Sequence, residues 1–259
     1  MERVRKLLRS EDPLIHHRLS YGGFIGRRYP YFYMETPKAA CTTTKALLWR
    51  LEGLGPLPRL DKLHERPPGD PRPSPLSVPE DEAVAVLQGG STYRFFVWRD
   101  PVDRLRSAWH EKIHLRRDPG PQWDVWVEAL RSEFGLKPDQ DISFDLFVEY
   151  ICGVPDEIRD PHFMSQRLLI LSDHIDYHAV VRMDDYASGM AEVMTTIGVP
   201  KGQWPPLDER LNASDSGIAK VSSKTADRIR AAYRPAYTIV EAFQAARAVA
   251  GRSSRKAEK

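Results

Sequence analysis

The sequence predicts an α/β protein with a mainly parallel central sheet flanked by helices. Apolar segments typical of strands alternate along the chain with segments whose apolar residues recur at helical spacing. Charged and hydroxyl-bearing residues directly follow two of the predicted strands, and parallel sheets bind ligands beyond the carboxyl ends of their strands. With 259 residues, the chain is long enough to bury one substantial core.

The composition indicates a globular protein without a strong overall charge. Lys and Arg number 38 against 36 Asp and Glu, so the net charge is +2 and any anion site must be local rather than a whole-protein field for nucleic acid. No segment approaches the roughly 20 apolar residues that span a bilayer, and the N-terminus lacks the apolar part of a signal peptide. The two cysteines, Cys41 and Cys152, cannot form a disulfide framework. We therefore expect a soluble, cytoplasmic protein that binds no nucleic acid.

The first predicted strand covers Tyr29 to Glu35, and the first long helix covers Ala46 to Leu54. The stretch "YFYMETPKAACTTTK", from Tyr31 to Lys45, joins them. Residues Ala40 to Thr44 lie where the helix opens, and a helix N-terminus offers unpaired N–H groups and a partial positive charge. This junction can therefore surround a phosphate or a sulfate.

Side chains near the same junction add to the anion-binding pattern. Thr42, Thr43 and Thr44 contribute hydroxyl donors, while Lys38 and Lys45 contribute charges as the lysine of a P-loop does. The stretch lacks the glycines of GxxxxGK[ST], which disfavours a nucleotide triphosphatase. On this pattern alone, Thr42 could equally cap the helix, with both lysines in solvent.

A long proline-rich loop follows, from Gly53 to Pro79, and loops of this length are uncommon unless they cover a site. The loop contains His64. A short helix is predicted from Glu80 to Gln88, and the segment "YRFFVW" then predicts a buried strand that ends at Arg99.

The second polar junction reads "RDPVDRLRSAW". Arg99 ends the strand and Ser107 comes two helical turns later, so a guanidinium and a hydroxyl can meet around a second phosphate. Alternatively, Arg99 or Arg104 pairs with Asp100 or Asp103 on the surface.

The remaining elements complete the alternation. Helices are predicted from Gln122 to Phe134 and from Ser143 to Cys152, with Ser143 as the N-cap of the second. A short strand is predicted from His178 to Arg182. The long helical stretch after Ser222 is expected to be interrupted before Pro235.

The two junctions together resemble sulfotransferases that use 3'-phosphoadenosine 5'-phosphosulfate (PAPS), in particular the carbohydrate sulfotransferases of sulfotransferase family 2, which include the chondroitin 4-O and HNK-1 enzymes. The family motifs "PKxxCT" and "VRDPxxRxxSAY" read "PKAACTTTK" and "VWRDPVDRLRSAW" in this chain. The segments "DPHFMSQ", "VVRMDDY", "LNAS" and "YRPAYTIVEAF" follow in family order. Trp98, Trp109 and Ser165 depart from the family pattern, which puts the choice of acceptor in doubt more than donor binding.

The resemblance runs from about Tyr29 to Phe243 and implies a P-loop NTPase-like sulfotransferase fold. The chain lacks the cysteines and the membrane anchor of lumenal relatives, so it resembles a soluble bacterial-type member. We expect an N-terminal extension at residues 1–28, a sulfotransferase domain at residues 29–250 and a disordered basic tail at residues 251–259.

The resemblance also implies an enzyme that moves a sulfuryl group from PAPS to a hydroxyl acceptor, which we expect to be a carbohydrate or glycoconjugate, without a metal ion. Lys38 is expected to act on the bridging oxygen between sulfate and 5'-phosphate. Arg99 and Ser107 are expected to bind the 3'-phosphate. The residues expected to bind the 5'-phosphosulfate are Lys38, Ala39, Ala40, Cys41, Thr42, Thr43 and Thr44.

The acceptor hydroxyl requires a general base, and histidine has a suitable pKa for this role. His64 ranks first because related enzymes carry a histidine between the two donor motifs, and His162 in "DPHF" ranks second. His110 and His114 are interpreted as helix-surface residues, because a zinc site would need a third ligand. Any one of these histidines could instead be structural.

Two other functions remain open at this point. A nucleotide kinase-like enzyme would show magnesium-dependent ATP turnover, although the missing glycines and the Arg99 and Ser107 pair argue against it. A non-catalytic nucleotide- or saccharide-binding protein would bind without turnover.

Overall fold

The structure is a computed structural model that describes residues 2–67, 69–116, 120–211 and 220–257. Backbone contacts divide the chain into two compact units. Unit 1 comprises residues 1–98, 166–212 and 239–259, and unit 2 comprises residues 99–165 and 213–238.

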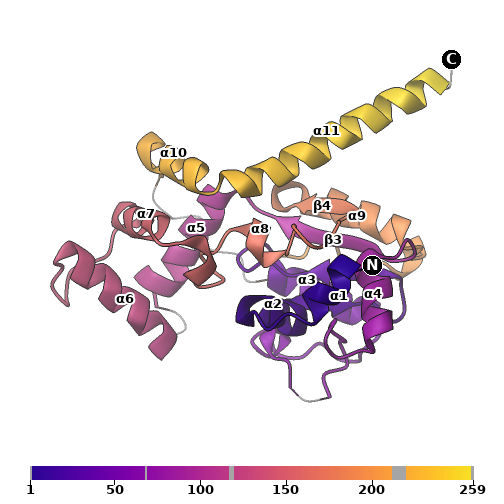
Figure 1. Cartoon of the computed structure of the whole chain (residues 1–259), viewed down its shortest axis with the longest axis horizontal. Helices are drawn as coiled ribbons and strands as arrows, with labels where there is room; N and C mark the ends of the chain where they lie inside the picture. Colours follow the sequence, from indigo (N-terminus) through magenta and orange to yellow (C-terminus); the bar gives the residue numbers. More distant parts are fainter. Residues whose placement is uncertain (1, 68, 117–119, 212–219, 258–259) are drawn as a thin grey trace. The chain divides into compact units, whose positions relative to one another are not determined.

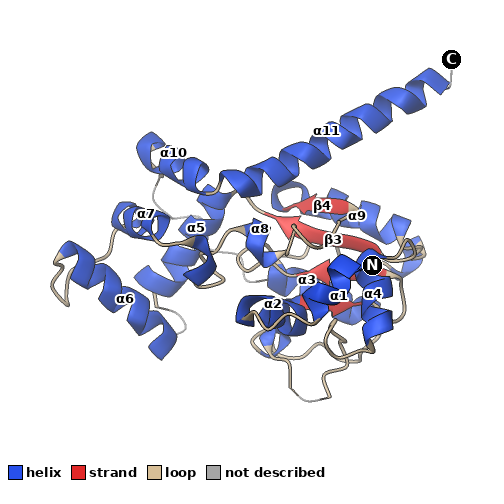
Figure 2. Cartoon of the chain, in the orientation of Figure 1, coloured by secondary structure: helices blue, strands red, loops and turns tan. Residues whose placement is uncertain are grey.

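Unit 1 contains a four-stranded sheet in the order β1-β2-β3-β4, drawn in red in Figure 2. β2 (Tyr31–Met34), β3 (Tyr93–Trp98) and β4 (Ala179–Arg182) run parallel, and β1 (Gly23–Ile25) pairs with β2 in the antiparallel direction. The predicted mainly parallel sheet with flanking helices is therefore confirmed.

The aromatic residues of β2 and β3 place large side chains on both faces of the sheet. Tyr33 pairs with Phe95 in the register, and their rings stack with centroids 5.3 Å apart. On the opposite face, the ring of Phe96 meets Tyr177 and Phe243 edge-on. Successive strand residues point to opposite faces, so a run of buried aromatic residues needs cover on both sides, and helices supply it.

Helices of unit 1 lie around this sheet, as Figure 1 shows. α3 and α9 pack their apolar residues onto the Tyr33 and Phe95 face, while Phe243 belongs to α11 on the other. The helices with residues in this unit are α1 (Glu2–Leu8), α2 (Pro13–His17), α3 (Cys41–Leu51), α4 (Glu80–Gln88), α8 (Gln166–Leu169), α9 (Tyr186–Thr196) and α11 (Arg234–Ala257). Short helical turns are η1 (Arg18–Gly22), η2 (Lys62–His64), η5 (Met183–Asp185) and η6 (Lys201–Gln203).

The helix bounds agree with the sequence prediction to different degrees. α4 has the predicted bounds, whereas α3 begins at Cys41, five residues before the predicted start at Ala46. α11 continues to Ala257, through the segment for which we expected no regular structure. In the part of the chain that is described, no helix has both the length and the apolar composition to cross a membrane.

Unit 2 is helical and has its own apolar core. Its elements are α5 (Pro101–Trp109), η3 (His110–His114), α6 (Pro121–Phe134), α7 (Phe144–Gly153), η4 (Asp156–Ile158), α10 (Ser223–Ala232) and the first residues of α11. Ser143 caps α7 as predicted, because its hydroxyl accepts a hydrogen bond from the backbone N–H of Leu146 at 3.3 Å. The predicted interruption before Pro235 is also confirmed, since α10 ends at Ala232 and α11 begins at Arg234.

Candidate functional site

The first junction folds as a tight loop between β2 and α3. Lys38 and Ala40 have positive φ angles of 65° and 52°, and the N–H of Ala39 donates to the carbonyl of Thr36 at 3.2 Å. Left-handed backbone costs a residue with a Cβ atom about 1–2 kcal/mol, and such strain is typical of ligand sites. Left-handed residues in successive turns of backbone occur in anion-binding concavities, so the conformation of this loop suits an anionic ligand.

The loop leads into the N-terminus of α3. The N-cap residue is Ala40, which provides no side-chain hydrogen bond to the first turn. The alternative in which Thr42 caps this helix is therefore wrong. A helix start of this kind directs backbone N–H groups and a partial positive charge toward a ligand.

The hydroxyls of the first helical turn contact neighbours that the sequence did not indicate. Thr43 Oγ1 lies 3.1 Å from the backbone N and 3.3 Å from the carbonyl O of Leu211. Thr44 Oγ1 lies 3.0 Å from the carbonyl of Ala40 and 3.1 Å from the hydroxyl of Tyr186. Burial raises the pKa of Tyr186 to about 12, so its phenol remains a neutral hydrogen-bonding group at neutral pH. These bonds fix the start of α3 to distant segments of unit 1.

Lys45 lies inside the protein rather than beside the loop in solvent. Its side chain is fully buried, and Nζ is 2.5 Å from Glu35 Oε2 and 2.8 Å from His64 Nδ1. The buried guanidinium of Arg18 donates to the carbonyl of Glu35 and, at 2.8 Å, to the carbonyl of Leu169. Lys45, expected to be a second charge beside the anion-binding loop, is thus part of a buried cluster with Arg18 and Glu35.

The cluster changes the titration of Glu35. Burial by itself raises the pKa of this carboxyl, but the charges of Lys45 and Arg18 outweigh burial and lower the pKa from 4.5 to about 2. Because the folded-state pKa is below the unfolded value, Glu35 stabilises the fold above pH 4.5 and loses that contribution as the pH falls toward 2.

We expect this contribution to be visible in acid unfolding. Between pH 5 and pH 3, Glu35 should account for a loss of about 2 kcal/mol in the free energy of unfolding. Urea titrations of wild type and Glu35→Gln across this range measure it, because the glutamine variant lacks the titrating group. Equal pH slopes for the two proteins would contradict the assignment.

Two arginines, the buried Arg72 and the half-buried Arg66, hold the proline-rich loop, and with it His64. Arg72 donates to the carbonyls of Leu63 at 2.8 Å and Glu65 at 2.7 Å, and it pairs with Asp70. Arg66 donates to the carbonyls of Gly23 and Arg72. The loop is therefore hydrogen-bonded both internally and to β1, and His64 Nε2 lies 3.0 Å from Thr42 Oγ1.

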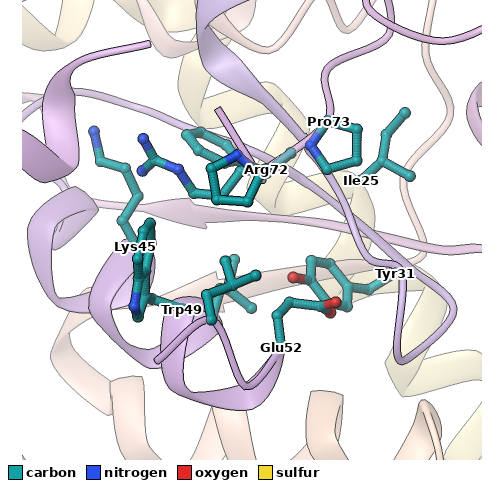
Figure 3. Close-up of a pocket in the computed structure, with 11 residues that line it drawn as sticks. Ile25, Tyr31, Lys45, Trp49, Glu52, Arg72 and Pro73 are labelled. Carbon is teal, nitrogen blue, oxygen red and sulfur yellow. The ribbon is translucent and has the colours of Figure 1, made fainter. Parts of the chain in front are cut away.

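A pocket in unit 1 lies between α3, the sheet and the proline-rich loop (Figure 3). It has about 310 Å³ of open space, including solvent at its mouth, and it is lined by Trp49, Glu52, Arg72 and the stem of Lys45 among others. No residue predicted to bind the donor lines it. The lining of this pocket therefore does not include the loop from Lys38 to Thr44.

The second junction opens α5 in unit 2. Asp100 is the N-cap and accepts a hydrogen bond from the N–H of Val102 at 2.8 Å. Arg99 is half-buried, and burial lowers the pKa of its guanidinium. Ser107 lies two turns into the helix and is 2% exposed. A guanidinium that has lost part of its hydration binds an anion more strongly than one in bulk water.

Arg104 has a structural role that the sequence did not reveal. It is 1% exposed and donates to the carbonyls of Pro161 at 2.7 Å and Met164 at 2.6 Å. The alternative in which Arg104 forms a surface ion pair is therefore wrong. Instead, α5 holds the turn that contains His162.

His162 forms a pair with Asp160. Asp160 Oδ1 accepts hydrogen bonds from the backbone N–H of His162 at 2.8 Å and from Nδ1 at 2.7 Å. Burial by itself raises the pKa of Asp160, but the hydrogen bonds from the side chain and backbone of His162 outweigh it, so the pKa is lowered. Since Nδ1 carries the hydrogen, the neutral ring has its lone pair on Nε2, as a general base requires.

The later motifs that resemble those of the family contain residues that bond to other parts of the protein. Gln166 Nε2 donates to the carbonyl of Val97 at 3.1 Å and lies 3.4 Å from Thr36 Oγ1. These two contacts link Gln166 to the carboxyl ends of β2 and β3. Arg182 and Asp184 form an exposed ion pair at 2.5 Å. In the "LNAS" motif, residues 212–214 lie outside the described residues.

His110 and His114 stack on each other with ring centroids 5.6 Å apart, and His114 also stacks on Trp109 at 5.1 Å. Both histidines lie in the π-helical turn η3, which brings the two rings together. Within the described ranges there is no group of three or more His, Cys, Asp or Glu side chains that could hold a metal ion.

The fold and the first junction define an α/β protein with a loop suited to bind an anion at the carboxyl end of a parallel strand. A family model described as "Sulfotransferase family" matches residues 23–238, from the first residue of β1 into α11. The chain therefore belongs to the sulfotransferase family, a family of transferases. No curated protein and no solved structure matches the chain significantly.

Proposed function

We propose that this protein is an enzyme that transfers the sulfuryl group of PAPS to a hydroxyl of a carbohydrate or glycoconjugate. One observation carries the proposal: the motif "PKAACT" of a sulfotransferase family member folds as a left-handed loop that opens into the N-terminus of α3. That loop fits an anionic group, because backbone N–H groups at a helix start bind phosphate and sulfate oxygens. A kinase-like function has no comparable support.

In the proposed donor site, residues 38–44 bind the 5'-phosphosulfate. The backbone of Ala39 and Ala40 shapes the loop, Cys41 begins α3, and Thr42 has its hydroxyl on the first turn. Thr43 and Thr44 hold the helix start through their side-chain bonds. We assign Arg99 and Ser107 to the 3'-phosphate, in accordance with the family resemblance.

In the reaction, the acceptor oxygen forms a bond to sulfur while the bond between sulfur and the 5'-phosphate oxygen breaks. The electron pair of that bond leaves with adenosine 3',5'-bisphosphate, and the acceptor proton passes to a base. Lys38 places an ammonium near the oxygen on which negative charge develops, where it stabilises the transition state more than the ground state. This scheme uses no metal ion.

For the general base, the hydrogen bonds favour His162 over His64. Asp160 orients His162 through Nδ1 and leaves the Nε2 lone pair to accept a proton. In contrast, both ring nitrogens of His64 already contact other side chains of unit 1. We therefore propose His162 as the base, although the sequence ranked His64 first.

The acceptor class and the location rest on the sequence. We propose a saccharide acceptor because the motifs resemble those of carbohydrate sulfotransferases. We propose a cytoplasmic location because the two cysteines, Cys41 and Cys152, are both free thiols.

Calorimetry with adenosine 3',5'-bisphosphate tests the donor site. We expect wild type to bind, and Arg99→Ala to weaken binding on the order of 10- to 100-fold, because a charge-assisted hydrogen bond is lost. Adenosine 5'-monophosphate lacks the 3'-phosphate, so its affinity should be the same for wild type and variant.

Arg182→Ala, which removes an exposed arginine paired with Asp184, serves as the matched control. Absence of heat with the bisphosphate would count against the proposed function. Magnesium-dependent ATP turnover would instead select the kinase alternative.

A further inference from the structure

We propose that His64 is a positioning residue of the donor loop: it donates a hydrogen bond to Thr42 and thereby directs the Thr42 hydroxyl hydrogen toward the phosphosulfate. This inference rests on the proposed function and deepens it, because it assigns the hydrogens of His64 and Thr42 at the first turn of α3. Three features of unit 1 support it.

The first feature is the ring tautomer of His64. Nδ1 lies 2.8 Å from the ammonium nitrogen of Lys45, which can only donate hydrogen bonds, so Nδ1 is the acceptor. In the neutral ring the hydrogen is then on Nε2, which lies 3.0 Å from Thr42 Oγ1. Nε2 is therefore the donor and the Thr42 oxygen is the acceptor.

The second feature is the rigidity of the group that sets this tautomer. Lys45 has a fully buried side chain and is held by Glu35 at 2.5 Å, so its ammonium keeps one position. His64 itself lies on the loop that Arg72 fixes through the carbonyls of Leu63 and Glu65. The chain from Glu35 through Lys45 and His64 to Thr42 is thus held at both ends.

The third feature is the consequence for Thr42. A hydroxyl has one hydrogen to donate and two lone pairs to accept. When His64 Nε2–H occupies a lone pair, the Thr42 hydrogen points to another acceptor. Thr42 is the second residue of α3, at the helix start that the proposed function assigns to phosphosulfate, whose oxygens only accept hydrogen bonds. The network therefore favours a fully ionised anion over a ligand that donates hydrogen bonds.

The same arrangement separates His64 from proton transfer. With its hydrogen on Nε2, that nitrogen has no lone pair for the acceptor proton, while Nδ1 accepts from Lys45. Loss of His64 should therefore change donor binding, whereas loss of His162 should change the pH dependence of turnover.

A pair of matched variants tests the inference. Gln at position 64 places an amide N–H near the position of Nε2, and Asn places its amide near Nδ1, so only Gln can donate to Thr42. We expect His64→Gln to keep the donor KM near that of wild type, and His64→Asn, His64→Ala and Thr42→Val each to raise it about five- to tenfold. The double variant His64→Ala with Thr42→Val should be no worse than either single variant, because both remove one interaction.

The pH profile and the KM-against-kcat split distinguish positioning from base catalysis. The acidic limb of kcat/KM should persist in His64→Gln and disappear in His162→Gln. If His64→Gln instead loses kcat as severely as His64→Ala, with an unchanged donor KM, His64 is the base and the inference is overturned.

A ligand-independent measurement separates this inference from the proposed function. Long-range ¹H–¹⁵N NMR of the unliganded protein should show the hydrogen of His64 on Nε2, and a spectrum with the hydrogen on Nδ1 overturns the inference even if the bisphosphate binds. If wild type shows the expected tautomer but binds no adenosine 3',5'-bisphosphate, the proposed function fails, and the role of Thr42 toward the donor fails with it.

Discussion

Replacing Lys38 by alanine should abolish sulfuryl transfer while leaving nucleotide binding largely intact. The lysine is assigned to the oxygen whose charge grows as the bond to sulfur breaks, so its removal affects the transition state more than the bound ground state. Loss of one preorganised donor of this kind typically costs 10²–10³-fold in kcat. Alanine retains a Cβ atom at this left-handed position, so the loop keeps its backbone conformation.

The measurement requires an acceptor, which a screen of glycans, lipids and small metabolites with radiolabelled donor can supply. Turnover of Lys38→Ala and its affinity for adenosine 3',5'-bisphosphate are then compared with those of wild type. Lys201→Ala removes an exposed lysine of the same unit and serves as the control. Turnover of Lys38→Ala near the wild-type rate would refute the assigned role.

Of the substitutions considered for stability, Lys45→Met should cause the largest decrease in the free energy of unfolding. The substitution leaves the Glu35 carboxylate, which is 2% exposed, without its partner at 2.5 Å. Removing one member of a buried ion pair typically costs 3–5 kcal/mol, because the remaining charge stays buried. Urea unfolding at pH 7 measures the change in the free energy of unfolding.

The exposed pair of Lys62 and Glu65, at 2.6 Å, provides a matched control. Lys62→Met should cost much less than Lys45→Met, because solvent screens an exposed pair. Adding Glu35→Gln to Lys45→Met should recover part of the loss, since the unpaired charge is then removed. A loss below about 1 kcal/mol for Lys45→Met would show that the carboxylate finds another partner.

The main elements of the fold could be predicted because their signals are local. β3 and α4 have the predicted bounds to within a residue, since a continuous apolar run and a helix after Pro79 are recognisable without tertiary information. β1 was missed because three residues, Gly23–Ile25, are too few for a pattern, and their pairing with β2 is set by the fold. The N-terminal helices α1 and α2, of seven and five residues, are also short.

The candidate site could be predicted in part for the same reason. The loop from Lys38 to Thr44 is contiguous, so its motif is visible in the sequence. Tyr186 lies 142 positions from Thr44, and Arg18 lies 151 positions from Leu169, so only the folded chain brings them together. Glu35 did carry a signal, because an acidic residue at the end of a buried aromatic strand requires a buried partner.

Helix α5 carries Ser107 and, three residues earlier, Arg104, which secures the turn of His162 through Pro161 and Met164. Residues three apart on a helix are surface neighbours, and their spacing is set by the helical repeat itself. In the proposed mechanism, Ser107 contacts the 3'-phosphate and Arg104 supports the turn of the proton acceptor. Both side chains thus extend from the same helix, α5. Any change that tilts this helix would move both together.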